Sequence, residues 1–119
     1  MTDNSNKTIF ERSHCPIACA LDQLGDKWSL LIIRDLLLGK RRYQEFLTSP
    51  EQIATNILAD RLKKLESAGI IVQYAYQQKP VRFEYELTQK GGDLRPVLEA
   101  LVNWGKVYYP GATVFKSHE

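Results

Sequence analysis

The sequence predicts a mixed α+β domain that is mostly α-helical and contains a single pair of β-strands. Three observations carry this prediction: apolar residues recur at helical spacing up to Gly69, the composition then becomes typical of strands, and helical spacing returns after Thr88. With 119 residues, 44% of them hydrophobic and 25% charged, the chain can form one domain with its own core. We expect that domain at residues 13–110, between a flexible N-terminal arm at residues 1–12 and a C-terminal tail at residues 111–119.

Two helices are predicted in the first third of the chain. The first begins at Pro16, which suits the first helical position because its missing N–H has no partner to lose there, and it ends at Gly25. The second has its body at residues 28–38, with Asp26 as its cap and Gly39 at its end. This body is apolar nearly all round, so we expect it in the core.

A short helix at residues 43–47 and a long helix are predicted next. Residues 49–52 read Ser-Pro-Glu-Gln, the form of a capping box whose serine and glutamine side chains satisfy the first free N–H groups of a helix. The long helix is therefore expected to start there and to end near Ala68, just before Gly69.

A β-hairpin is predicted from two segments rich in Val, Ile, Tyr and Phe, at residues 70–77 and 81–87, with the turn at residues 78–80. Thr88 can then cap a last helix that runs through Trp104.

The start of this last helix is weakened by Gly91, Gly92 and Pro96, through backbone entropy and a missing N–H, and Pro110 and Gly111 close it. The complete order is helix, helix, short helix, long helix, two-stranded hairpin, helix. This is the order of a winged helix-turn-helix domain.

The long helix has a polar face that can read DNA. At 100° per residue an apolar stripe faces the core, and the opposite arc carries Thr55, Asn56, Ala59, Asp60 and Lys63. Short and amide side chains let a helix approach base edges in a major groove, and a cation there can meet a phosphate or guanine. A plain solvent-facing surface is the alternative interpretation.

Two charged residues of this helix need separate interpretations. Asp60 would repel phosphate unless it accepts from a cytosine amine or pairs with Lys63 or Lys64. Arg61 lies beside the apolar stripe, and we interpret it as a structural ion-pairing residue rather than a base reader.

Positive charge is concentrated in the middle of the chain. Residues 40–82 carry eight cations and four anions, although the whole chain has a net charge of only +2. Lys79 and Arg82 at the hairpin tip suit phosphates or a narrow minor groove. Arg42, with its neighbours Lys40 and Arg41, is expected to divide between phosphate contacts and surface ion pairs. An ordinary charged surface would give the same count.

Several other classes of protein are disfavoured. The longest apolar run, at residues 30–33, is too short to span a membrane, and the N-terminus has no export signal, so we expect a cytoplasmic protein. Two cysteines and two distant histidines make a zinc site improbable. No nucleotide-binding or nucleophile motif is present, so we expect neither a cofactor nor an enzyme.

With the long helix and the hairpin in place, the chain resembles the HxlR-type family of bacterial winged-helix transcriptional regulators, which are relatives of the MarR group. The resemblance runs from about Cys15 to Gly105. The segments that carry it are residues 15–16, 24–28, 42–46, 58–66, 69–71 and 80–88, which read CP, LGDKW, RYQEF, LADRLKKLE, GII and PVRFEYELT. The family usually has a small hydroxyl residue where this chain has Ala54, so Ser49 or Thr55 is expected to cap the long helix instead.

The resemblance implies a homodimer joined by its first and last helices, which binds double-stranded DNA at a palindromic operator. Each long helix would enter a major groove and each wing would contact the flanking backbone. Apolar residues of the last helix would supply the dimer surface, or complete the core of their own chain: Leu94, Val97, Leu101, Trp104 and Tyr108. Repression is the commoner mode among relatives.

Cys15 is the candidate sensor. It precedes Pro16 at the head of a helix, where the helix dipole favours a thiolate, and His14 can add positive charge. In several family members a cysteine at this place responds to oxidants, quinones or aldehydes, through a disulfide or an adduct. Inert capping is the alternative for Cys15. Cys19 is either a resolving thiol, if the helix start gives way, or a small buried hydrophobe.

The sequence thus predicts a dimeric DNA-binding repressor that responds to oxidants or electrophiles through Cys15. Two alternatives are a winged-helix regulator controlled by a non-covalent small-molecule ligand, and a winged-helix module that binds protein.

Overall fold

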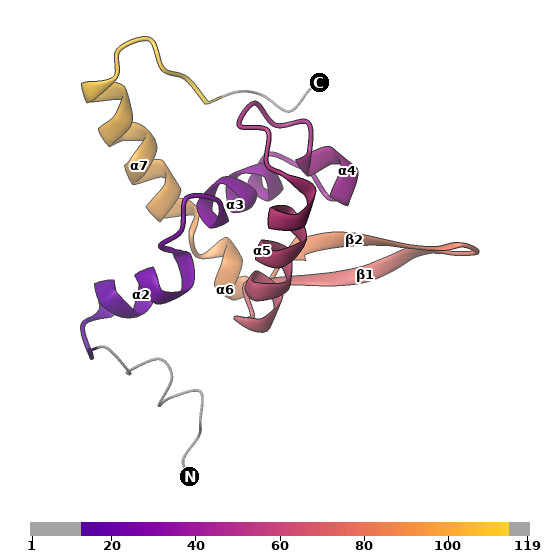
Figure 1. The fold of residues 1–119 in the computed structure, drawn as a ribbon. Coiled ribbons are helices and arrows are strands. Elements are labelled where there is room, and N and C mark those ends of the chain that lie inside the picture. The colour runs from indigo at the N-terminus through magenta and orange to yellow at the C-terminus, as the bar shows by residue number, and fades with distance from the viewer. Residues whose placement is uncertain (1–12, 115–119) are drawn as a thin grey trace.

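The computed structural model describes residues 13–114 (Figure 1). The arm predicted at residues 1–12 and the end of the tail, residues 115–119, lie outside the described residues. The elements, labelled as in Figure 1, are α2 (Pro16–Leu24), α3 (Ser29–Leu37), α4 (Tyr43–Phe46), α5 (Thr55–Ser67), β1 (Ile71–Gln78), β2 (Val81–Leu87), α6 (Gln89–Gly92) and α7 (Arg95–Tyr108). Their order confirms the predicted mixed fold with a two-stranded antiparallel sheet.

The core lies where α3, α4 and α5 meet the base of the hairpin. As predicted, α3 is a core helix, and the apolar stripe of α5 faces it. Burying these side chains is the main driving force for folding. The buried side chains of the core are Leu24, Ile32, Ile33, Leu36, Phe46, Ile53, Leu58, Leu62, Leu65, Ile70 and Ile71.

The predicted Thr88 cap is confirmed, and Asp26 bonds to the start of α3 although the N-cap residue of that helix is Trp28. The Asp26 carboxylate accepts hydrogen bonds from the backbone N–H groups of Trp28 and Ser29, at 2.8 and 2.9 Å, and so satisfies the start of α3. The Thr88 hydroxyl accepts from the N–H of Gly91 at 3.2 Å at the start of α6. At the other end of α3, Gly39 has a φ of 107°, a conformation that a glycine adopts without strain.

The predicted capping box at residues 49–52 is wrong. Helix α5 begins only at Thr55, and its N-cap is Ala54, which offers no side-chain oxygen. Neither Ser49 nor Thr55 takes over the N-cap position. The Ser49 hydroxyl instead donates to the buried Asp35 carboxylate at 2.6 Å. Hydrogen bonding to a distant buried charge therefore outweighs the local cap.

The last helix is divided in two. The break lies between Gly92 and Arg95, where the two glycines and Pro96 disfavour a continuous helix. Gly91 is required by packing, because a Cβ there would lie 2.2 Å from the carbonyl oxygen of Ile70. The second part, α7, continues beyond Trp104 to Tyr108.

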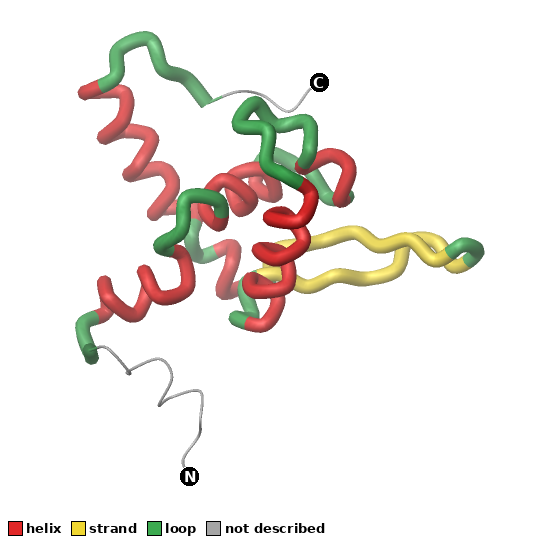
Figure 2. The backbone as a smooth tube through the Cα atoms, in the orientation of Figure 1, coloured by secondary structure: helices red, strands yellow, loops and turns green. Residues whose placement is uncertain are grey.

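The hairpin projects away from the helical body (Figures 1 and 2). Its base pairs Ile71 with Leu87, and its outer end pairs Gln78 with Val81. An irregularity between Ala75 and Gln77 leaves Tyr76 outside the regular pairing. The hairpin therefore carries its tip residues well away from the core.

Helices α2 and α7 extend from the opposite side of the molecule (Figure 1). No residue of α7 is buried, although one side of the helix is apolar and aromatic. The large exposed apolar side chains of the two helices are Ile17, Leu21, Val97, Leu101, Trp104, Val107 and Tyr108. Exposed apolar surface of this extent is typical of an interface.

Candidate nucleic-acid interface

Helix α5 presents the predicted polar face to solvent. Thr55, Asn56, Ala59, Asp60 and Lys63 are all exposed. The opposite face of the helix is buried, with Leu58, Leu62 and Leu65 in the core. The helix is therefore anchored by its leucines and leaves short, amide and cationic side chains available at the surface.

The negative charge of Asp60 is balanced within the helix. Its carboxylate forms an ion pair with Arg61 and lies 3.4 Å from the Nζ atom of Lys64. Lys63, among the described residues, has no ion-pair partner. The exposed face of α5 thus keeps one cation available for an anionic ligand.

Arg61 joins α5 to the start of α3. Its Nε atom donates to the Asp26 carboxylate at 3.0 Å, which agrees with the structural role predicted for it. Partial burial opposes ionisation of Asp26, but hydrogen bonds from Ser29, from the Trp28 and Ser29 N–H groups and from Arg61 lower its pKa to about 2. One carboxylate therefore bonds to the start of α3 and holds α5.

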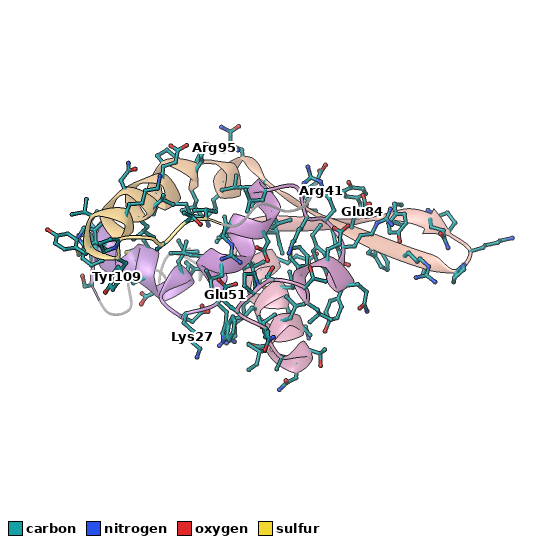
Figure 3. All side chains as sticks on the ribbon, turned by 90° about the horizontal axis from the view of Figure 1, so that it is seen from above. Lys27, Arg41, Glu51, Glu84, Arg95 and Tyr109 are labelled. Carbon is teal, nitrogen blue, oxygen red and sulfur yellow. The ribbon has the colours of Figure 1, made fainter. Side chains whose placement is uncertain are left out.

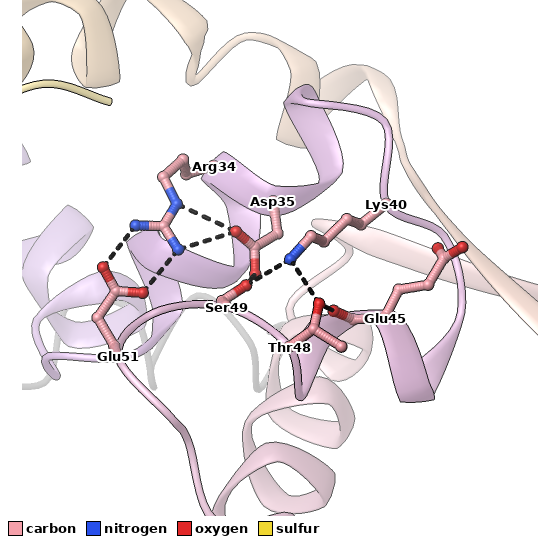
Figure 4. A network of polar contacts seen from close by, with 7 residues as sticks. All are labelled: Arg34, Asp35, Lys40, Glu45, Thr48, Ser49 and Glu51. Carbon is pink, nitrogen blue, oxygen red and sulfur yellow. Dashed lines mark hydrogen bonds and ion pairs between the residues drawn. The ribbon is translucent and has the colours of Figure 1, made fainter. Parts of the chain in front are cut away.

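A buried polar network fixes the turn that leads into α5 (Figure 4). The Asp35 carboxylate, whose residue is 3% exposed, accepts from the Ser49 hydroxyl at 2.6 Å and from Arg34 at 2.9 and 3.0 Å. The Lys40 ammonium donates to Ser49 at 2.8 Å and to Thr48 at 3.2 Å. Two cations and one carboxylate thus connect the end of α3 to the residues that follow α4.

Glu51 extends this network toward solvent. Arg34 donates two hydrogen bonds of 2.8 Å to the Glu51 carboxylate (Figure 4), and this pairing lowers the pKa of Glu51. The next residue, Gln52, has a φ of 58°, which is uncommon outside glycine. The network therefore holds an unusual backbone turn just before the exposed helix.

These contacts correct one prediction. Lys40 was expected on the surface with Arg41 and Arg42, but it is only 9% exposed and its ammonium is used inside the protein. A signal for the network exists in the sequence, since Asp35 interrupts an otherwise apolar helix. Its partners could not be deduced, because they lie on other elements.

We call the hairpin β1–β2 the wing. Arg42 is the N-cap residue of α4 and lies where the helix-turn-helix unit, α4 and α5, meets the wing. Its Nε atom donates to the Glu84 carboxylate at 2.9 Å, and its guanidinium lies 3.9 Å from the ring centroid of Tyr76. Beside it, the carbonyl oxygen of Arg41 accepts from the N–H of Tyr85 at 2.7 Å. Arg42 is thus engaged by two wing residues.

The wing tip carries the other predicted cations. Lys79 and Arg82 are exposed, and within residues 13–114 neither forms an ion pair. They lie at the far end of a projecting hairpin (Figures 1 and 3), which is an arrangement suited to the DNA backbone.

The two cysteines lie on the opposite side of the fold from the wing. Cys15 is the N-cap residue of α2 and is exposed, and its N–H donates to the Ser13 hydroxyl at 2.9 Å. Cys19 is partly buried, and its thiol donates to the Ser13 carbonyl oxygen at 3.6 Å. Both thiols are free of disulfide bonds.

Within the described part of the chain, no group of three or more His, Cys, Asp or Glu side chains could hold a metal ion. No helix among these residues is both long and apolar enough to cross a membrane.

A helix-turn-helix unit whose second helix is exposed and polar, beside a projecting two-stranded hairpin, defines a winged helix-turn-helix protein. Residues 23–112 match the HxlR-like helix-turn-helix family, and the chain belongs to this family. It is 40% identical over 106 residues to an uncharacterized HTH-type transcriptional regulator of Synechocystis sp., an alignment that covers 88% of this chain and 78% of that protein.

Solved structures of similar proteins include the following two. PA1607, provisionally described as a transcription factor, has 39% identity and a TM-score of 0.78 over 93% of this chain and 75% of that one. The redox regulator HypR in its oxidized form has 32% identity and a TM-score of 0.72, over 84% of this chain and all of that one. The protein is therefore a transcriptional regulator, and its family consists of DNA-binding proteins rather than enzymes.

Proposed function

We propose that this protein is a dimeric, sequence-specific repressor that binds a palindromic operator in the cytoplasm. The observation that carries the proposal is the exposed face of α5, where Thr55, Asn56, Ala59 and Lys63 surround an internally paired Asp60. In this proposal the short and amide side chains contact base edges, and Lys63 contacts a phosphate or guanine. Lys79 and Arg82 contact the flanking backbone.

The proposed dimer uses the exposed apolar sides of α2 and α7. The side of α7 that exposes Trp104, Val107 and Tyr108 gains stability when a second copy covers these side chains. A two-fold dimer would bring two copies of α5 into successive major grooves if they lie roughly 34 Å apart. Selected binding sites should then contain two inverted half-sites.

Selection from random duplexes, followed by titration at several salt concentrations, tests the DNA-binding role. We expect affinity to fall steeply as salt rises, because phosphate contacts release counterions. Asn56→Ala should relax base preference at one position of each half-site, with a loss of about 1–3 kcal/mol in discrimination. Ser67→Ala is the matched control, because Ser67 is exposed at the far end of the same helix.

Two results would overturn this role. One is the absence of selected half-sites, and the other is unchanged base preference in Asn56→Ala. Binding to a protein partner that salt does not weaken would favour the alternative of a protein-interaction module.

The proposal assigns the signal to Cys15. Its exposure at the N-terminus of α2, and the similarity to HypR, which is named a redox regulator, support this role. A quinone would accept the Cys15 sulfur at a ring carbon and take up the proton as a hydroquinone adduct. With peroxide, two Cys15 thiols would lose two electrons and two protons to form an intersubunit disulfide, while the peroxide is reduced to water.

Operator binding before and after treatment with benzoquinone or peroxide tests the sensor. We expect treatment to change the affinity of the native protein and of Cys19→Ser, but not that of Cys15→Ser. An equal response of the native protein and Cys15→Ser would remove Cys15 from the mechanism.

A second mode of control is favoured by a cleft of about 510 Å³ between α3, α7 and the segment after α7. This volume suits a small organic ligand. Its walls include Leu30, Arg34, Leu37, Leu98, Val102 and Val114. A non-covalent effector would act equally on Cys15→Ser and the native protein, and Asn103→Trp, at an exposed position on the edge of the cleft, would block it.

A further inference from the structure

We propose that Arg42 is a positioning residue of the wing: it holds Glu84 and Tyr76 so that the wing tip meets DNA, and it does not itself bind a phosphate. The inference rests on the proposed DNA-binding function and concerns how the wing tip is oriented toward DNA. It assigns Arg42 a role other than the phosphate contact that its charge alone suggests.

Three neighbouring contacts join the wing to the start of the helix-turn-helix unit. Arg42 pairs with Glu84 at 2.9 Å, and the N–H of Tyr85 donates to the carbonyl oxygen of Arg41 at 2.7 Å. The ring of Tyr85 packs edge-on against the buried Phe46 at 6.2 Å between centroids. Figure 3 shows Arg41 and Glu84 together where the hairpin leaves the body.

The chemistry of the contact favours an arginine. The planar guanidinium donates to Glu84 and also lies over the Tyr76 ring at 3.9 Å. A lysine ammonium is a point charge without a planar group to stack on the ring, so it reproduces this combined contact less well. Tyr76 lies at the irregularity of β1, so Arg42 holds the wing at the place where its strands bend.

Small movements at this contact have large effects at the tip. A hairpin of two strands has little stability of its own, so its direction depends on what holds it. Arg82 lies two residues and the end of β2 three residues from Glu84, which is roughly 7–10 Å along the strand, and Lys79 lies in the turn just beyond. A rotation of about 10° at Glu84 would therefore move the tip by roughly 1–2 Å, enough to break a phosphate hydrogen bond.

The two roles of Arg42 predict opposite results for one substitution. If Arg42 bound phosphate, Glu84→Gln would release it and remove a negative charge near DNA, so affinity would rise or stay the same. If Arg42 positions the wing, Glu84→Gln leaves the wing without its contact, and affinity falls although the protein has become more positive.

Glu86 is the matched control. It lies on the same strand and its carboxylate accepts from the Tyr74 hydroxyl at 3.5 Å, as Glu84 does at 3.2 Å, but no contact joins it to Arg42. Glu86→Gln therefore makes the same change of charge without releasing the wing.

The experiment measures operator affinity and its salt dependence for the native protein and its variants. We expect Glu84→Gln, Arg42→Ala and Arg42→Lys each to weaken binding by about fivefold, and the double variant Arg42→Ala/Glu84→Gln to be no weaker than Arg42→Ala. In Glu84→Gln the plot of log affinity against log salt should become shallower, with the magnitude of its slope smaller by about 1–2, because the tip cations leave their phosphates. In a Lys79→Ala/Arg82→Ala background, Glu84→Gln should have no further effect.

Amide hydrogen exchange gives a readout without DNA. The N–H of Tyr85 should exchange faster in Glu84→Gln than in Glu86→Gln, while the amides of α5 are unchanged. Unchanged or tighter operator binding by Glu84→Gln overturns the positioning role while the DNA-binding function stands. If the native protein binds no duplex in a salt-dependent way, the proposed function fails, and this inference fails with it.

Discussion

Helix α5 and the wing are held to the molecule in different ways. The turn into α5 is fixed by buried charges, with Asp35 and Lys40 only 3% and 9% exposed. The outer wing is held by Arg42 and Glu84, whose side chains are 48% and 18% exposed. Buried ion pairs are costly to break, whereas exposed pairs contribute little to stability. The protein thus has a firmly held exposed helix beside a wing whose direction can be altered without unfolding.

The largest expected effect comes from the buried network. Asp35→Ala removes the buried carboxylate that accepts from the Ser49 hydroxyl and from Arg34, and should lower the free energy of unfolding by about 3–5 kcal/mol. Urea denaturation measures the loss. Glu99→Ala, at an exposed position of α7, is the control and should change stability by no more than about 0.5 kcal/mol. A loss of similar size in both variants would show that the buried network stabilises the fold no more than an exposed charge does.

The packing of α6 against Ile70, the residue before the wing, should behave like the core rather than like the wing tip. Gly91→Ala forces a Cβ to within 2.2 Å of the Ile70 carbonyl oxygen, so we expect a loss of roughly 2–3 kcal/mol in unfolding free energy. Gly92 has open space around its Cα. Gly92→Ala should therefore be neutral or stabilising by up to about 1 kcal/mol, and thermal denaturation of the two variants compares them directly.

The contribution that Asp26, which links α5 to α3, makes to the free energy of unfolding should depend on pH. Because the pKa of Asp26 is lowered to about 2 in the folded protein, the unfolded chain takes up the proton first as pH falls. The stability that Asp26 supplies is complete above about pH 5 and is mostly lost by pH 2, and it amounts to about 1–2 kcal/mol after allowance for solvent.

Urea unfolding of the native protein and Asp26→Asn at pH 5 and at pH 2 measures this contribution. The difference between the two proteins should shrink at the lower pH. A constant difference would show that Asp26 acts through its shape rather than its charge.

The smallest effect on stability is expected at the wing tip. Arg82→Ala should change the free energy of unfolding by less than about 0.5 kcal/mol. It should nevertheless lower operator affinity, and the magnitude of the slope of log affinity against log salt should decrease by about 0.9. Gln78→Ala, an exposed and uncharged neighbour, is the control. A clear loss of stability in Arg82→Ala would show that the tip is packed more firmly than its exposure indicates.

Most elements of the fold could be predicted because their signals are local. Pro16 and Gly25 mark the ends of α2, Thr88 caps its helix as predicted, Asp26 bonds to the start of α3, and the leucine spacing identifies the buried face of α5. Arg61 was also interpreted correctly, since its place beside the apolar stripe indicates an ion pair within the protein.

The errors arose where side chains from distant segments compete for one group. Ser49 has the form of a helix cap, but Asp35 and Lys40 take its hydroxyl, so α5 starts at Thr55. Lys40 reads as a surface cation and is in fact buried. No spacing rule could reveal these partners, because they come from α3 and from the loop that follows it.

The sequence by itself determined the order of the helices and strands, the polar face of α5 and the cationic wing tip, because periodicity, caps and turns act between residues near one another. Only the tertiary structure decided where α5 begins, which cations face solvent and what holds the wing. Those outcomes depend on electrostatic and hydrogen-bonding competition between groups that are far apart in the chain and meet only when the core has formed.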